Sequence, residues 1–567
     1  MQLHFNLHPC DAAAGQTLFE CAERLGIKVP TSCNKNGKCR ECLVEISEGM
    51  ELLSPRTPEE NHLREKFRLS CRCQINSTSG VVRCHTLRRG EMRIERHAFE
   101  LPTTHKKLPP DPAVTRDGEK ILLDGIEIAR STAPIHGLAM DLGTTTVVVR
   151  LLNLETGEVV ADASFENPQR FGGSDVMARI QFDTHDKSRL LQRTLAGYLS
   201  HAIEEFPVDP LTIYELVVAD NSTMRDIFFR LNVHSIGQSP YRSLTELEMD
   251  EGKRTTTSLT ESAKKLGLPI HPQARVYGLP IISGHVGADA AACMLAVGLA
   301  DEDRTVAVMD IGTNTELILG NKNKIFAASC PAGPAFEGGA IACGMPGLPG
   351  AIKKINIAAD GSAQAGVIGD VAAQGICGSG LVDLLGELLR THRINNLGRF
   401  ENGEDRFNLD VQSEPLQGGA PVSDPARLPP AHHPAGSETG APIFFTESDI
   451  NELAQAKGAN VAGLQVIFND FGISFTDLDV FYLAGGFGRH LNIESSKRIG
   501  LIPNIADEKI VQVGNAAIEG ACIALLSRTK RGELETLVKN VTHCRLEAHE
   551  NFFVEGCQFN PVDVSHV

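Results

Sequence analysis

Residues 138–152 read LAMDLGTTTVVVRLL, and residues 306–320 repeat the same pattern as VAVMDIGTNTELILG. Each copy is an apolar strand that ends in an aspartate, passes through a Gly-Thr turn and enters a second strand. One such hairpin would be weak evidence, but two ordered copies indicate an internal duplication. Because strands punctuated by glycine alternate with helical stretches from residue 137 onwards, the sequence predicts two related α/β lobes.

The two repeated turns are suited to binding the phosphates of a nucleotide. Backbone amides and hydroxyls of a Gly-Thr turn can face phosphate oxygens, while the preceding aspartate can hold Mg²⁺. A third stretch, FYLAGGFGRHLN (481–492), is a strand that enters a Gly-Gly turn, where a flat base or ribose can lie against the backbone. The alternative interpretation is that these are two ordinary hairpins and a glycine turn.

A cysteine-rich stretch, CNKNGKCREC (33–42), is the second strong signal in the chain. Eight of the fifteen cysteines precede residue 85, and in a reducing compartment this clustering favours a metal site over disulfides. Cys33, Cys39 and Cys42 follow the spacing C-x5-C-x2-C, and Cys71 offers a fourth thiol. Four thiolates in this arrangement predict a 2Fe-2S cluster.

Two questions about the cysteine site stay open in the sequence. Zinc also accepts four thiolates, but zinc ribbons use two C-x2-C knuckles and this chain offers one. The absence of any metal is the third possibility. Cys73 competes with Cys71 as the fourth ligand, although the two would point to opposite sides of a strand. The loop itself resembles the adrenodoxin and putidaredoxin variant of the ferredoxin fold, in which the longer first spacing is usual.

The chain divides into four parts by its pattern. Residues 1–86 read as short alternating strands with helical stretches near 17–26 and 57–68, which indicates a small α+β domain. Residues 87–136 read as a linker with a small subdomain of its own. We expect lobes at 137–303 and 304–567, the second interrupted by a Pro-, Gly- and His-rich surface insertion at 401–445 that we expect to be mobile.

Composition excludes some classes of function. The 567 residues carry a net charge of −17 with a pI near 5.6, which lacks the basic footprint of a nucleic-acid binder. The chain has no run of about 18 apolar residues and no signal peptide at its start. We therefore expect a cytoplasmic protein that binds neither nucleic acid nor a membrane.

The three nucleotide-site motifs together resemble the phosphate 1, phosphate 2 and adenosine motifs of the ATPases typified by acetate and sugar kinases, Hsp70 and actin. This resemblance implies ribonuclease H-like lobes, with Asp141 and Asp310 as the catalytic, Mg²⁺-binding carboxylates. It assigns the remaining nucleotide contacts to Gly143, Thr144, Thr145, Gly312, Thr313, Asn314, Gly485, Gly486 and Phe487. The glycine turn and apolar helix of ICGSGLVDLLGELL (376–389) are similar to the connecting helix of that superfamily.

A ferredoxin-like (β-grasp) domain ahead of an actin-like ATPase resembles the reductive activators of corrinoid proteins. Four further stretches match that family, namely NPQRFGGSDVMARI (167–180), SGHVGADAAA (283–292), CPAGPAFEGGAI (330–341) and LAGGFGRHLN (483–492). The stretch DNSTM (220–224) departs from the family's usual GNTTM. The resemblance covers almost the whole chain except the insertion.

The resemblance implies a function. Such proteins donate one electron to the Co(II) corrinoid of a partner methyl-carrier protein and so restore Co(I) for methyl transfer, with the help of ATP. It also implies an upstream electron donor and a possible homodimer. Cys544 and Cys557 are the only cysteines near the C-terminus, so further clusters there are not expected.

Two other functions remain open from the residues alone. The first is a small-molecule kinase of the same ATPase superfamily that uses its cluster as a redox sensor. The second is an electron carrier or scaffold with an inactive nucleotide site, but the retention of both Asp141 and Asp310 argues against decay of that site.

Overall fold

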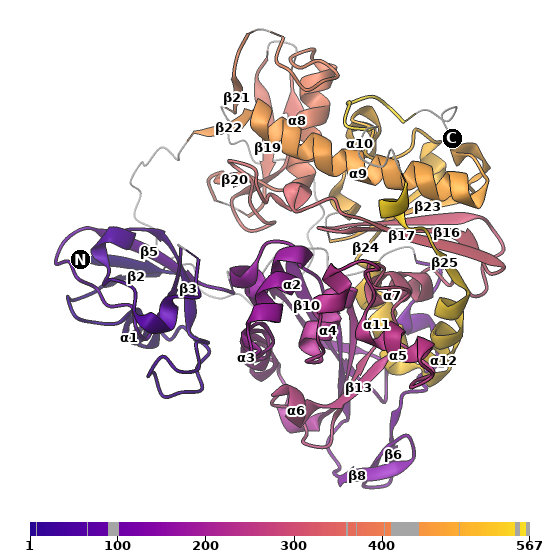
Figure 1. Cartoon of the computed structure of the whole chain (residues 1–567), viewed down its shortest axis with the longest axis horizontal. Helices are drawn as coiled ribbons and strands as arrows, with labels where there is room; N and C mark the ends of the chain where they lie inside the picture. The colour runs from indigo at the N-terminus through magenta and orange to yellow at the C-terminus, as the bar shows by residue number, and fades with distance from the viewer. Residues whose placement is uncertain are drawn as a thin grey trace.

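The computed structural model (Figure 1) describes residues 1–6, 8–64, 66–88, 101–358, 361–369, 371–401, 403–409, 442–486, 488–549 and 556–562. Within these residues, no helix has both the length and the apolar character needed to cross a membrane. The expected insertion at 401–445 lies mostly outside the described residues. Its two ends pair with each other as the antiparallel strands β21 (Arg406–Leu409) and β22 (Ile443–Thr446).

The N-terminal domain, called the ferredoxin domain below, is a five-stranded mixed sheet with one helix. Its strand order is β2-β1-β5-β3-β4, and β1 runs parallel to β5 while the other pairs are antiparallel. The helix α1 (Leu18–Arg24) begins with a capping box between Thr17 and Glu20. The strands are β1 (Gln2–Phe5), β2 (His8–Asp11), β3 (Leu43–Glu48), β4 (Phe67–Leu69) and β5 (Val81–Thr86).

One expected helix of this domain does not form in the described residues 57–64 and 66–68. The stretch 57–68 forms a single 3-10 turn at Pro58–Glu60 instead of a helix. The side chain of Glu60 is fully buried, where it pairs with Arg68 at 2.8 Å and accepts a hydrogen bond from the amide of Leu69. Because a buried carboxylate must be satisfied by its neighbours, the chain wraps around Glu60 instead of continuing as a helix.

The described part of residues 87–136 includes a small sheet. Strands β6 (Val114–Asp117), β7 (Lys120–Leu123) and β8 (Ile126–Arg130) form a three-stranded antiparallel sheet. Figure 1 shows this sheet projecting from the body of the molecule.

The two lobes repeat one topology. In the first lobe the strands lie in the order β11-β10-β9-β12-β14, and in the second in the order β17-β16-β15-β23-β24. In each order, the first three strands form antiparallel pairs. The next two strands run parallel to the third strand of the order, which is β9 in the first lobe and β15 in the second. This equivalence confirms the duplication that the hairpins predicted. An additional strand lies at one edge of each sheet: β13 beside β14, and β25 beside β17.

The strand bounds are as follows. The first lobe contains β9 (His136–Leu142), β10 (Thr146–Asn153), β11 (Val159–Glu166), β12 (Ile213–Asp220), β13 (Leu259–Ser262) and β14 (Arg275–Gly278). The second contains β15 (Val306–Ile311), β16 (Thr315–Asn321), β17 (Lys324–Cys330), β23 (Val480–Ala484), β24 (Ile510–Gly514) and β25 (Val541–His543). A smaller sheet joins β18 (Ala351–Ile357), β19 (Ala363–Val367) and β20 (Gly375–Ile376).

Helices cover both sheets. The first lobe carries α2 (Val176–His185), α3 (Leu190–Glu204), α4 (Ser222–Phe228), α5 (Leu244–Asp250), α6 (Ala263–Leu266) and α7 (Ala288–Ala296). The second part of the chain supplies α8 (Gly378–Arg390), α9 (Glu447–Phe471), α10 (Ile493–Arg498), α11 (Ala516–Leu526) and α12 (Arg528–Leu537). The expected helix at 376–389 is α8, and a capping box between Thr446 and Asp449 begins α9.

The helix α11 connects the two lobes. It follows β24 of the second lobe in the sequence but packs against β9 and β12 of the first-lobe sheet and against α7. Each of its residues is buried. A side chain at Gly520 would lie 2.1 Å from the carbonyl oxygen of Ala292, so the small residues of this helix permit a close approach.

Candidate functional site

The four predicted cluster cysteines gather at one end of the ferredoxin domain. The sulfur atoms of Cys42 and Cys71 are 3.2 Å apart, although 29 positions separate them in the chain. The Cys33 and Cys39 thiols interact with each other, and the hydrogen bond from Cys42 lowers the pKa of Cys71 against the opposing effects of burial and of the Cys33 and Cys39 charges. These four thiols come from the loop before β3 and the turn after β4.

Backbone amides of the loop face these sulfurs. Burial raises the pKa of the Cys33 thiol, but the amides of Cys39, Asn36 and Gly37 outweigh it and lower that pKa to about 7. The loop reaches this shape through left-handed residues, among them Asn34 (φ +53°) and Gly37 (φ +81°). An array of thiols and converging amides matches what a 2Fe-2S cluster requires, because it stabilises thiolates and hydrogen-bonds to cluster sulfides.

Cys73 lies elsewhere. It is fully buried, and burial raises its pKa to about 12, with Arg68 and Glu60 as its nearest charges. The pKa of the Cys84 thiol in the domain core is raised by burial and, to a smaller extent, by the charge of Cys73. The structure therefore brings Cys71, and not Cys73, together with the other three cysteines.

The predicted nucleotide-site residues line one cavity of ≈ 330 Å³ between the two lobes. Those on its wall are Asp141, Gly143, Thr144, Thr145, Asp310, Gly312, Thr313, Asn314, Gly485 and Gly486. Phe487 lies outside the described residues. Segments far apart in the chain thus meet at the ends of the equivalent strands β9 and β15 and at the end of β23.

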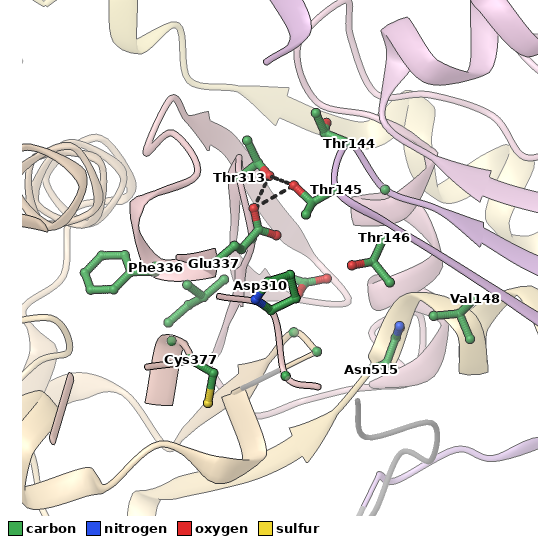
Figure 2. Close-up of a pocket in the computed structure, with 18 of the residues that line it drawn as sticks. Thr144, Thr145, Thr146, Val148, Asp310, Thr313, Phe336, Glu337, Cys377 and Asn515 are labelled. Carbon is green, nitrogen blue, oxygen red and sulfur yellow. Dashed lines mark hydrogen bonds between the residues drawn. The ribbon is translucent and has the colours of Figure 1, made fainter. Parts of the chain in front are cut away.

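The two phosphate turns touch across this cavity (Figure 2). The hydroxyl oxygens of Thr145 and Thr313 are 2.7 Å apart. Both hydroxyls also donate to the carboxylate of Glu337, that of Thr145 at 2.8 Å. Burial raises the pKa of Glu337, and the two threonine hydrogen bonds partly oppose that rise. Glu337 therefore binds a turn of each lobe at the same time.

Besides Glu337, four further carboxylates line the cavity, and their chemistry suits a divalent cation. Burial raises the pKa of Asp310 to about 6 and that of Asp289 to about 7, with Asp310 raising the latter further. Burial and the charges of Asp310 and Asp289 raise the pKa of Asp141 to about 7. Burial and the same two aspartates raise the pKa of Glu316 well above its usual value. Repulsion of this kind is relieved by Mg²⁺, which prefers carboxylate oxygens.

Several residues of the cavity were not predicted from the sequence. The amide of Asn515 donates to Asp141 at 2.7 Å, and that of Asn221 donates to Thr144 at 2.9 Å. The thiol of Cys293 donates to Asp310 at 3.2 Å. Glu337 and Asp289 lie in the stretches 330–341 and 283–292, which matched the family pattern without any assigned role.

Comparisons with protein families divide the chain in the same order as these sites. The model of the 2Fe-2S iron-sulfur cluster binding domain matches residues 7–76. The model of the RACo middle region matches residues 136–302, and that of the C-terminal domain of RACo, the ASKHA domain, matches residues 304–562. The chain therefore carries a 2Fe-2S cluster-binding domain followed by an actin-like ATPase fold.

Relatives match over about three quarters or more of the chain. The corrinoid activation enzyme RamQ of Eubacterium limosum is 28% identical over 97% of this chain and 96% of its own length. The Co(II) methylated amine-specific corrinoid protein reductase of Methanosarcina barkeri is 25% identical over 74% of this chain and 75% of its own. A solved reductive activator for a corrinoid, iron-sulfur protein aligns with a TM-score of 0.69 and 25% identity, covering 99% of this chain and 98% of that one. With its cluster-binding domain, middle region and ASKHA domain in this order, the chain is homologous to a corrinoid activation enzyme and to a reductive activator of a corrinoid, iron-sulfur protein.

Proposed function

We propose that this chain is an ATP-dependent activator that passes one electron at a time to the Co(II) corrinoid of a partner methyl-carrier protein and so restores Co(I). The observation that carries the proposal is the presence in one chain of two sites. Four thiols with converging amides form the first, and a cavity that joins duplicated Asp and Gly-Thr turns forms the second. The homology of the chain to corrinoid activation enzymes supports the choice of acceptor.

Cys33, Cys39, Cys42 and Cys71 are the proposed ligands of the 2Fe-2S cluster. When bound, this cluster supplies one electron per turnover, which matches the one-electron step from Co(II) to Co(I). The loop before β3 keeps the cluster near solvent, because residues 34–36 and Lys38 are exposed and Cys33 is half-buried. A partner protein can therefore approach the electron donor closely.

Asp141 and Asp310 are the proposed Mg²⁺-binding carboxylates of the ATP site, with Asp289 and Glu316 beside them. Mg²⁺ held by these carboxylates would supply positive charge beside the phosphates, which would favour transfer of the terminal phosphoryl group to water. The phosphates are held by the two turns, through Gly143, Thr144 and Thr145 of the first and Gly312, Thr313 and Asn314 of the second. Gly485 and Gly486 leave room for the adenosine. Phe487 is proposed to border it.

The chain's side chains also position these groups. Asn515 orients Asp141 through its amide, and Asn221 orients the hydroxyl of Thr144. Glu337 accepts hydrogen bonds from the hydroxyls of Thr145 and Thr313. A phosphate that enters between the turns must therefore replace these hydrogen bonds. ATP binding is thereby linked to the relative position of the lobes, which is how we propose that its energy assists an unfavourable electron transfer.

We further propose that a separate electron donor reduces the cluster, that the protein acts in the cytoplasm and that two copies form a homodimer. The homodimer is tested by measuring the molar mass in solution.

The main test combines the reduced, cluster-loaded protein with ATP, Mg²⁺ and a Co(II) corrinoid carrier, and follows the cobalt absorption spectrum. We expect Co(I), or methylated cobalt when a methyl donor is present, only when ATP is added. Absence of an ATP-dependent change would reject the proposal for that carrier. Formation of a phosphorylated small molecule without any protein partner would favour a kinase instead.

A further inference from the structure

The ferredoxin domain lies beside α3 of the first lobe (Figure 1), and it contacts both α3 and the short segment Asn167–Gly172. Arg193 of α3 donates to the carboxylate of Glu41 at 2.6 Å and to the carbonyl oxygen of Cys39 at 2.9 Å. The hydroxyl of Tyr198 accepts from the amide of Leu87 at 3.0 Å. One lobe-side arginine thus binds the cluster loop itself, at the backbone of a proposed cluster ligand.

The segment Asn167–Gly172 makes a second contact through Arg170. The guanidinium of Arg170 donates to Glu45 at 2.5 Å and lies 5.9 Å from the centre of the Phe67 ring. Glu45 lies on β3 and Phe67 on β4, and the two residues are directly paired across these strands. Cys42 immediately precedes β3, and Cys71 follows β4 by two residues. Arg170 therefore holds both strands that lead to the paired thiols.

The other end of the same segment is bound to the phosphate 1 turn. The backbone amide of Asn167 donates to the carbonyl oxygen of Thr145 at 2.6 Å. The side-chain amide of Asn167 donates to the carbonyl oxygen of Gly143 at 2.8 Å. Asn167 is fully buried. Its side-chain oxygen also accepts from the amide of Gln169 at 2.9 Å, which fixes the start of the 3-10 helix that carries Arg170.

These contacts form a short continuous path from the ATP cavity to the cluster strands. On one side of Thr145 its hydroxyl contacts Thr313 and Glu337 across the cavity, and on the other its carbonyl binds Asn167. Three residues later, Arg170 binds the ferredoxin domain. The side chains of Arg170 and Glu45 are only 15% and 6% exposed, so their attraction is little screened by water and salt.

We propose that Asn167–Gly172 couples the phosphate 1 turn to the docking of the ferredoxin domain, with Asn167 and Arg170 as positioning residues. Occupation of the cavity by different nucleotides moves Thr145, and the segment transmits this movement to β3 and β4. The strength with which the ferredoxin domain binds the first lobe then depends on which nucleotide occupies the cavity. This inference rests on the proposed function of the ATP site, and it assigns to the first lobe a role in presenting the cluster to its partners.

The test uses hydrogen exchange of the full, cluster-loaded chain with Mg²⁺ and either ADP or a non-hydrolysable ATP analogue. We expect amide exchange in residues 39–48 to differ about threefold or more between the two nucleotides. Arg170→Met should abolish this difference while changing nucleotide affinity, measured by calorimetry, by no more than about the same threefold factor, because the coupling is reciprocal. Glu45→Gln removes the same ion pair from the ferredoxin side and should have the same effect, which keeps the test informative if one variant folds poorly.

A matched control removes an ion pair at the same interface but off the path. Lys28 of the ferredoxin domain pairs with Glu204 at the end of α3 at 3.4 Å, and both side chains are about half exposed. Lys28→Met should retain the nucleotide-dependent difference. The inference is overturned if the unmodified protein binds both nucleotides without a difference in exchange, or if both Arg170→Met and Glu45→Gln retain it.

The result is separable from that of the proposed function. ATP-dependent Co(I) formation without any nucleotide response in residues 39–48 would reject the coupling alone. A nucleotide response without ATP-dependent reduction of a corrinoid carrier would instead support the coupling and count against the proposed acceptor.

Discussion

At the scale of single residues, the ATP cavity is a place where the fold tolerates electrostatic repulsion. The cavity is lined by Asp141, Asp289, Asp310 and Glu316, and burial raises the pKa values of all four carboxylates. The charges of neighbouring carboxylates raise the pKa values of Asp141, Asp289 and Glu316 further. Ionising such groups without a cation costs the folded state free energy. The arrangement is therefore costly for the empty protein and favourable once a divalent cation is bound.

The first prediction follows from this repulsion. Asp310→Asn should raise the stability of the Mg²⁺-free protein, because burial raises the pKa of Asp310 from 3.8 to about 6 and its charge is costly at neutral pH. The expected gain is on the order of 1–3 kcal/mol. The same variant should lose most of the stabilisation by Mg²⁺ and ATP, which is about 2.7 kcal/mol for the unmodified protein at a hundredfold excess over Kd. Thermal unfolding with and without Mg²⁺ and ATP measures both changes.

Asp303→Asn serves as its control, because that carboxylate is 77% exposed and pairs only with Lys322 at the surface. It should change neither quantity appreciably. A fall in the Mg²⁺-free stability of Asp310→Asn would contradict the repulsion argument.

The second prediction distinguishes the two candidate cysteines. Cys71→Ser should lower the iron content well below the roughly two atoms per chain of a 2Fe-2S cluster and weaken its visible absorption. Cys73→Ala should retain the cluster and lose about 1 kcal/mol of stability, because Cys73 packs as a small apolar side chain in the core. Iron analysis and denaturation of both variants test this. Retention of the full iron content by Cys71→Ser would show that its thiol is not required.

Residue-level prediction from the sequence had a clear limit. Asp141 and Asp310 could be proposed because each ends a strand in a repeated pattern. Glu337 and Asn515 could not, because each reaches the cavity from a segment without such a repeat, and only the folded chain brings them to Thr145 and Asp141. The partners of a residue are set by tertiary packing, which local patterns do not encode.

At the scale of elements, local signals were reliable where they were strong. The capping box at Thr446 and Asp449 marks the start of α9, and the glycine turn of residues 376–380 leads into α8. The stretch 57–68 has helix-forming residues, yet a buried ion pair between Glu60 and Arg68 overrides them. Helical propensity is a weak preference that a tertiary contact of this kind readily exceeds.

The third prediction concerns the packing of α11. Gly520→Val should destabilise the protein by about 1–3 kcal/mol or more, because even a Cβ atom there would lie 2.1 Å from the carbonyl oxygen of Ala292. Gly532→Ala on α12 is the matched control, since an added Cβ meets nothing within 4 Å. That control should be neutral or stabilise by up to about 1 kcal/mol. Equal stability of the two variants in urea denaturation would refute close packing at Gly520.

At the scale of the whole molecule, the chain is organised so that each lobe depends on the other. The helix α11 belongs to the second part of the sequence but packs against the first-lobe sheet. Asn515, which precedes this helix, donates a hydrogen bond to Asp141. On the opposite side of the cavity, Glu337 joins Thr145 and Thr313. Movements of the lobes are therefore coupled to the two turns proposed to bind phosphate.

The fourth prediction tests this coupling through Glu337. Glu337→Ala should lower ATP turnover in the presence of the corrinoid carrier by roughly tenfold to a hundredfold, because the two phosphate turns lose their shared acceptor and the lobes no longer close in register. Glu337→Gln should recover part of the activity, since its amide oxygen can still accept from a threonine hydroxyl. Glu494→Gln, at a carboxylate that is 80% exposed, should have no effect. If Glu337→Ala kept full turnover and ATP affinity, lobe closure would have to depend on other contacts, such as that between Asn515 and Asp141.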